Sequence, residues 1–174
     1  TTTDASSNGG NSAYSAATVA LSTSVTASND APLATGSATL SSIAEDTAAN
    51  AISGATVATL FAGNFSDSAD AVAGGSSANT LAGVVITSNA ALASQGSWQW
   101  NNGGTWTTIS STLNDSSGLF LSSSTAIRFL PLANFNGSPG SLSARLVDSS
   151  ITPPSSGTTT DASSNGGNSA YSAA

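Results

Sequence analysis

The chain has 174 residues, enough for one domain with a substantial core, and only 6% of them are charged. Its net charge of −7 argues against binding to nucleic acid or an anionic membrane surface and makes cations its natural partners. The sequence has no Cys, which excludes disulfides, and without His, Cys or Lys it offers no conventional base for a serine nucleophile, so we expect no enzymatic activity. No apolar run approaches the ~20 residues of a membrane span, so we expect no membrane insertion.

One segment occurs twice. Residues 1–17 and 158–174 both read TTTDASSNGGNSAYSAA, and the offset between them is 158 − 1 = 157 residues. Selection on a fold alone would not keep two distant copies identical at freely replaceable Ser, Thr and Asn positions. The simplest interpretation is a piece of a longer array with a 157-residue period, cut so that its ends overlap. Such repetition favours a structural role over a catalytic one, and we expect other copies of the repeat to be the partners.

The first elements in chain order belong to this overlap. Residues 18–27 alternate as a half-buried strand does, with one face made of Val19, Leu21, Val25 and Ala27. Before them, Asn8-Gly9-Gly10-Asn11 is typical of a hairpin turn. We therefore predict that residues 1–28 are terminal strands of the preceding repeat. Residues 29–32 form a short, stiff junction, because Pro32 fixes its own φ and pushes its neighbour toward an extended backbone.

The remaining elements are short. Residues 37–43 suit a first strand that ends at Glu45 and Asp46, whereas residues 55–62 fit a helical turn as well as a strand. Further strands are predicted around 84–86, 97–100, 105–109, 119–121, 127–129 and 142–147, with residues 101–104 as a hairpin turn. Short strands separated by turn signals, with no sustained helical period, predict an all-β fold, an antiparallel β-sandwich. Residues 33–174 would be one such repeat lacking its last strand, which the segment equivalent to 18–27 would supply.

The junction and the later strands also carry a family resemblance. The NDAP junction, the strand after it, the acidic ED pair, and the stretches SWQWNNGGTWTTI, IRFLPLANFNGSPG and SLSARLVDSS resemble cadherin-like or immunoglobulin-like tandem repeats of giant bacterial extracellular, adhesin-type proteins. The resemblance implies an immunoglobulin- or cadherin-like topology with Greek-key connections and an extracellular or cell-surface location. It also implies calcium at the domain boundary, with Glu45, Asp67, Asp70 and Asp148 of one unit meeting Asp30 of the linker.

The acidic residues themselves suit calcium, a hard cation that takes six to eight oxygen ligands. The candidate metal ligands lie at the junction, after the first predicted strand, in the next loop and at a strand end: Asp30, Glu45, Asp46, Asp67, Asp70 and Asp148. Several acids at one pole would repel one another without a cation. The alternative is that they are solvated loop charges or turn caps, with Asp67 and Asp148 bonding backbone N–H groups.

The cationic and aromatic residues have plainer interpretations. Arg128 and Arg145 are predicted on outward strand faces, where each pairs with a carboxylate or covers apolar surface. Alternation in a hairpin favours core positions for the tryptophans, and a sugar-binding platform is the alternative: Trp98, Trp100 and Trp106. The sequence thus predicts a structural repeat of an extracellular fibre, filament or adhesin stalk, stiffened by calcium and completed by strand pairing with its neighbour. The rival prediction is a glycan-binding adhesin module.

Overall fold

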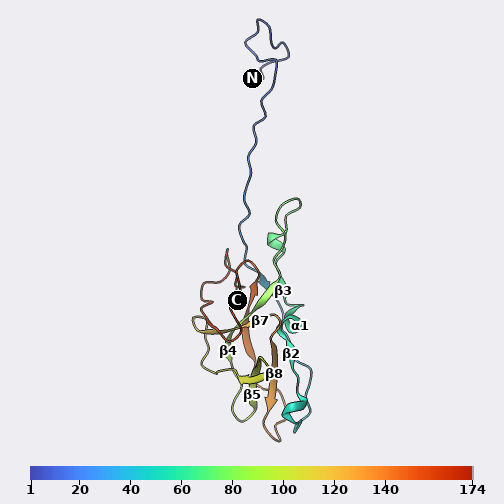
Figure 1. Ribbon diagram of the computed structural model, residues 1–174, viewed down its shortest axis with the longest axis vertical. Helices are drawn as coiled ribbons and strands as arrows, with labels where there is room; N and C mark the ends of the chain where they lie inside the picture. The colour runs from blue at the N-terminus through green and yellow to red at the C-terminus, as the bar shows by residue number, and fades with distance from the viewer. Residues whose placement is uncertain (174) are drawn as a thin grey trace.

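The chain consists of a compact body and a long extended N-terminal segment (Figure 1). A computed structural model describes residues 1–173. Besides two single-turn 3-10 helices, η1 (Ala49–Ala51) and η2 (Ser68–Asp70), it contains β1 (Leu33–Ala34), β2 (Ala55–Thr56), α1 (Val57–Phe61), β3 (Phe65–Ser66), β4 (Leu81–Asn89), β5 (Gly96–Asn102), β6 (Thr105–Thr108), β7 (Gly118–Ser122), β8 (Ala126–Pro131), β9 (Leu142–Asp148) and β10 (Thr159–Thr160).

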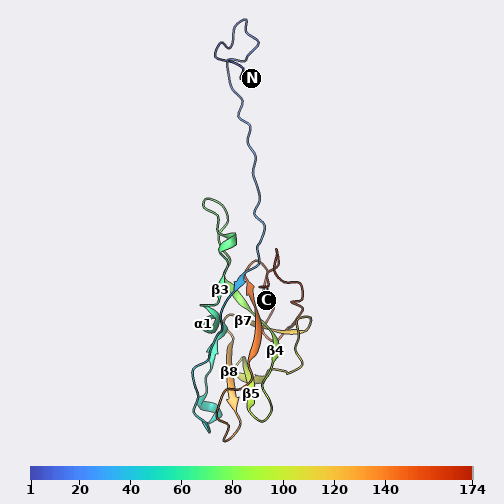
Figure 2. The same cartoon turned by 180° about the vertical axis from the view of Figure 1, so that it is seen from behind.

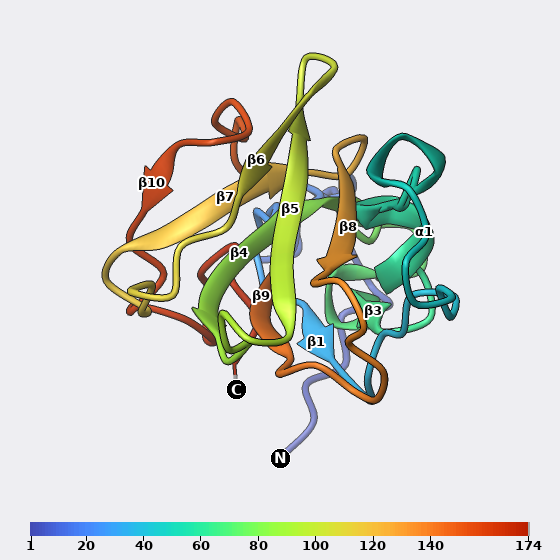
Figure 3. The same cartoon turned by 90° about the horizontal axis from the view of Figure 1, so that it is seen from below.

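The strands form two four-stranded sheets and one small pair. One sheet has the order β10-β7-β4-β9 and the other β2-β8-β5-β6, while β1 pairs with β3. Every pairing is antiparallel. Figure 3, seen along the long axis, shows the two sheets as separate layers. The predicted all-β, antiparallel class is therefore confirmed.

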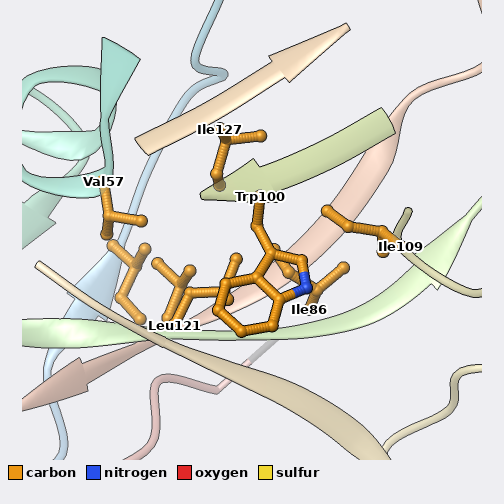
Figure 4. Packing of buried hydrophobic residues seen from close by; sticks show 8 residues of the cluster. Val57, Ile86, Trp100, Ile109, Leu121 and Ile127 are labelled. Atoms are coloured by element: carbon orange, nitrogen blue, oxygen red, sulfur yellow. The ribbon is translucent and has the colours of Figure 1, made fainter. Parts of the chain in front are cut away.

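The core lies between these two sheets (Figure 4). One cluster of buried residues combines side chains from both layers with Val57 of α1 and Ile109 after β6: Val84 and Ile86 of β4, Leu121 of β7, Leu146 of β9, Trp100 of β5 and Ile127 of β8. Burial of such side chains is the main favourable term in folding. This packing is consistent with the predicted sandwich, and the Greek-key connections stay a prediction.

Local patterns predicted several elements correctly. The tryptophan hairpin is confirmed as β5 and β6, joined by Gly103 and Gly104, both with positive φ. Residues 55–62, which fitted a strand and a helical turn equally well, form first a short strand and then a helical turn. The two residues of β2 pair with β8, and α1 then begins where the Thr56 hydroxyl accepts a hydrogen bond from the Thr59 N–H (3.2 Å).

The strand predicted over residues 37–43 is wrong. The first strand is β1, and residues 37–43 join no ladder among the described residues. Gly36 has φ +69°, a turn conformation that ends the extended run directly after β1. The alternation in this segment does correspond to one half-buried side, made of Ala38 and Leu40. No strand within residues 1–173 pairs with the segment to form hydrogen bonds with it.

Residues 18–27, also predicted as a strand, are extended but unpaired within this chain. Val19, Leu21 and Val25 are 95%, 100% and 93% exposed. Figures 1 and 2 both show the segment leading away from the body. A period-2 apolar face needs a neighbouring strand and a core to cover it, and residues 29–173 provide neither for this segment.

The second copy of the repeated segment covers the outer face of the β9 sheet instead. Ala162 and Ala170 are buried against Val85, Phe120 and Val147. In the predicted strand 142–147, Val147 falls by alternation on the face of Ser143 and Arg145, opposite to Leu142 and Leu146, and its side chain does lie on that outer face. It is nevertheless fully buried, because the polar-looking segment after residue 158 packs over it.

Candidate functional site

Three buried carboxylates gather at the pole where the N-terminal segment joins the body. Asp67 and Asp70 follow β3, and Asp148 ends β9. These three residues are 5%, 6% and 0% exposed. Their neighbours are Asn29 of the junction and Asn79, which comes just before β4. Because aspartate is rarely buried without a partner, this pole is the most unusual chemical environment of the fold.

The junction is bonded directly to two of the carboxylates. The Asp30 N–H donates to Asp70 Oδ1 (2.9 Å), and Asn29 Nδ2 donates to Asp148 Oδ2 (3.4 Å). Asn79 Nδ2 connects these two contacts, because it donates both to Asp70 Oδ2 and to Asn29 Oδ1, each at 2.9 Å. These contacts fix the course of the chain as it enters the body.

Asp67 is the unbalanced member of the group. Its Oδ2 accepts from the backbone N–H of Asn79, but its buried Oδ1 has no hydrogen-bond partner in residues 1–173. Burial raises the pKa of Asp67, and the neighbouring negative charges of Asp70 and Asp148 raise it further, against the lowering effect of the bond from Asn79. An unpaired buried carboxylate oxygen beside two other acids fits a cation ligand.

The donor set is incomplete in its present arrangement. Among residues 1–173, no three acidic side chains stand in a geometry ready to hold a metal ion. The Asn79 amide adds to this, since its NH₂ group donates to Asp70 Oδ2 and Asn29 Oδ1, two oxygens that a cation would share. Turning that amide about its own axis would exchange NH₂ for oxygen with little change of shape.

The other predicted ligands lie elsewhere. The carboxylate of Asp30 is exposed, and only its N–H joins the group. Glu45 Oε2 accepts from Asn136 (3.2 Å) and Asp46 Oδ1 from the Asn134 N–H (3.0 Å). Their loop is at the end of the body opposite to β3 (Figure 1). The structure therefore brings together Asp67, Asp70 and Asp148 and leaves Glu45 and Asp46 apart from them.

Part of the capping alternative also holds. Asp148 Oδ1 accepts from the N–H of Ser150 (2.8 Å), a local turn bond of the kind that acidic loop residues form. Sequence reasoning missed Asn79, whose only signal was an amide just before a buried strand. One carboxylate oxygen of Asp148 thus has a backbone partner, while Asp67 Oδ1 has none in the described residues.

The two arginines have structural roles. Arg145 pairs with Asp115 through two bonds (2.8 and 2.9 Å), which holds the pKa of that carboxyl below its ordinary value. Arg128, predicted on an outward face, is instead 6% exposed. It stacks 4.1 Å from the Trp106 ring centroid and donates to the Ala49 and Ile52 carbonyls, because η1 folds over its strand.

The tryptophans do not form one exposed aromatic surface. Trp100 lies in the core, and Trp98 packs edge-on against Phe129 (5.2 Å between ring centroids) while its Nε1 donates to the Gly140 carbonyl (2.7 Å). One face of Trp106 is covered by Arg128. This arrangement favours packing over the sugar-binding alternative.

Comparison with known proteins found no match for this chain: no family model matches it, and neither a curated protein nor a solved structure is similar to it. Within residues 1–173, no helix combines the length and the apolar character needed to cross a membrane.

Proposed function

We propose that this chain is a repeat unit of an extracellular fibre, filament or adhesin stalk. Its units join end to end through residues 29–32, and each is completed by the neighbour's N-terminal segment. Calcium bound at the acidic pole stiffens the junction. The single observation that carries the proposal is the contrast between the two copies of the repeated segment.

The two copies have the same local conformation. Gly9 and Gly10 have φ values of 71° and 55°, and the equivalent Gly166 and Gly167 have 70° and 56°. In each copy the first of these glycines donates its N–H to a tyrosine carbonyl at 2.9 Å, that of Tyr14 or Tyr171. The turn is therefore encoded locally, whether or not the segment is packed against a sheet.

The environments of the two copies differ completely. Ala162 is fully buried and Ser172 is 1% exposed, whereas the equivalent Ala5 and Ser15 are exposed. The first copy thus carries a docking surface in its docked conformation, with nothing to dock on among residues 29–173. In an array with a 157-residue period the second copy of one unit is also the first copy of the next. Its docking surface is therefore the outer face of the β9 sheet in the preceding unit, where the second copy packs in this chain.

Calcium would act where the junction meets the body. Asp67, Asp70 and Asp148 would supply carboxylate oxygens, and Asn29 and Asn79 would add amide oxygens. The ion would offset two of the three buried negative charges and tie the junction to both β3 and β9. A ligand that binds only the folded state raises the free energy of unfolding by mass action. At a calcium concentration one hundred times the Kd, this increase is about 2.7 kcal/mol.

Thermal melting of the full chain with calcium and with a chelator tests this site. We expect calcium to raise Tm by several degrees, and Asp67→Asn to abolish that rise without lowering the Tm of the calcium-free chain, because the substitution removes an unpaired buried charge. Asp46→Asn is the matched control, since Asp46 lies at the other pole and Asn tolerates its positive φ of 60°. An unchanged midpoint in calcium, or equal loss in both variants, contradicts the proposed site.

A further inference from the structure

An apolar groove runs along the free edge of β9. It is about 480 Å³ in volume, and its walls include Leu60, Phe61, Trp98, Leu142 and Leu146. A second hollow of about 640 Å³ continues it past Trp98 toward Phe129 and Phe135. In the strand order of the described residues β9 is the last strand of its sheet, so this edge is open to a further strand.

The docked second copy leads the chain into this groove. Tyr171 pairs with Val147 in an antiparallel bridge, flanked by bonds from the Asp148 N–H to the Ala170 carbonyl (3.0 Å) and from the Ser172 N–H to the Leu146 carbonyl (2.9 Å). Ala173 already lines the groove. Whatever follows a docked copy is therefore delivered to the open edge of β9.

In the first copy the residues that follow are 18–28. From this we infer that residues 18–22 of one unit continue the docked copy along the open edge of the preceding unit, past the start of β9 at Leu142 and along residues 139–141. Val19 and Leu21 would then fill the apolar groove. The inference rests on the proposed function, since it requires a neighbouring unit, and it specifies the partner surface and the register.

The register follows from the observed bridge. Tyr14 is the equivalent of Tyr171, which faces Val147. Thr18 comes four residues after Tyr14, so it faces the residue four before Val147, which is Ser143. By the same count Val19 faces Leu142, and Leu21 falls beside Gly140.

The side-chain faces agree with this register. Residues directly opposite each other in an antiparallel pair point to the same side of the sheet. Leu142 packs against the core cluster, so Val19 and then Leu21 point into the groove. Ser143 is exposed, so Thr18 points to solvent. A shift of one residue would reverse both faces, which fixes the register strongly.

A chain of two periods, made by continuing residue 174 with residues 18–174, allows a direct crosslinking test. The Val147–Tyr171 bridge is a non-hydrogen-bonded pair, and so is the Ser143–Thr18 pair two steps along, where Cα atoms lie about 4.5 Å apart, within disulfide range. Ser143→Cys in the first unit with Thr18→Cys in the second should oxidise to one intramolecular disulfide in nearly all molecules. The native sequence has no competing thiol.

The matched control replaces Ser22 instead of Thr18. Ser22 is also a small hydroxyl residue and lies on the same strand face as Thr18, but it is about 13 Å further along the strand. It should crosslink at least tenfold more slowly. Equal rates for the two pairs, or no disulfide in either, overturn the inference.

A second measurement covers the groove itself. Val19→Ser with Leu21→Ser should leave Tm of the single 174-residue chain unchanged, because both side chains are exposed there, and should lower Tm of the first unit in the two-period chain. No change in the two-period chain overturns the strand placement. The calcium response of the single chain tests the proposed junction independently. The calcium site and the strand placement can therefore fail separately.

Discussion

At the scale of single residues, Asp67 is the most informative position. Its Oδ1 is buried without a partner in residues 1–173, while Asp70 and Asp148 nearby each accept hydrogen bonds. An unpaired buried oxygen of this kind costs stability in the metal-free chain. A bound cation would remove this cost at Asp67. The exposed carboxylates of Glu45 and Asp46 carry no such cost.

The raised pKa of Asp67 predicts how pH changes the calcium effect. In the metal-free chain the native state binds a proton at Asp67 more tightly than the unfolded state does. Stability from this group therefore rises as pH falls through the raised native pKa toward the ordinary value of 3.8. Protons compete with calcium for the same oxygens, so the calcium-induced rise in Tm should shrink over that window. Calorimetry at a series of pH values with and without calcium measures it, and a rise in Tm that persists unchanged below pH 4 is the contrary result.

At the scale of elements, the docked segment after residue 158 should contribute to the stability of the unit. Ala162→Asp places a charge in a fully buried site beside Val85 and Phe120. We expect it to lower the free energy of unfolding by about 1–3 kcal/mol, with undocking of the segment limiting the loss. Denaturant unfolding of the full chain measures this.

The chain provides its own control for that substitution. Ala5→Asp makes the same change in the same local sequence, but Ala5 is exposed. It should alter the free energy of unfolding of the isolated chain by no more than about 0.5 kcal/mol. Equal effects of the two substitutions would mean that docking after residue 158 does not stabilise the unit.

Local patterns predicted a hairpin between two strands that are close in sequence and a strand whose own apolar run is pronounced. The hairpin of β5 and β6 follows from alternating tryptophans around Asn and Gly, and the β4 strand from its buried Val-Val-Ile run. Elements that depend on distant partners were less predictable. Val147 has the pattern of an outward residue, and its burial depends on a segment that contains few large apolar side chains.

The acidic site was predictable only in part, for the same reason. The family resemblance implied that Asp67, Asp70 and Asp148 meet at one domain boundary. The resemblance also implied that Glu45 meets Asp30 of the linker. Glu45 and its neighbour Asp46 lie at the other end of the body, and no local signal in the sequence tells which end a loop occupies. Their position depends on the long return through β8 and the loop around Asn134, a contact between distant parts of the chain.

At the scale of the whole molecule, the two poles have different roles. The junction enters at the pole of Asp67 and Asp148, and a strand that runs antiparallel to β9 from the docked copy would leave toward the Leu142 end. Successive units would therefore be added along the long axis of the body seen in Figure 1. The two surfaces of this head-to-tail contact differ, and a contact of that type generates a filament when its rotation does not close a ring.

Cryo-electron microscopy, in calcium, of a chain of several periods in which residues 158–174 of each unit serve as residues 1–17 of the next tests this account most directly. It predicts a linear row of bodies in which residues 1–17 of each unit lie on the outer face of the preceding β9 sheet. The same map should show Val19 beside Leu142 of that unit. Bodies joined by an unpaired residue 18–28 tether, or a solitary body with its own N-terminal segment folded back, would contradict it.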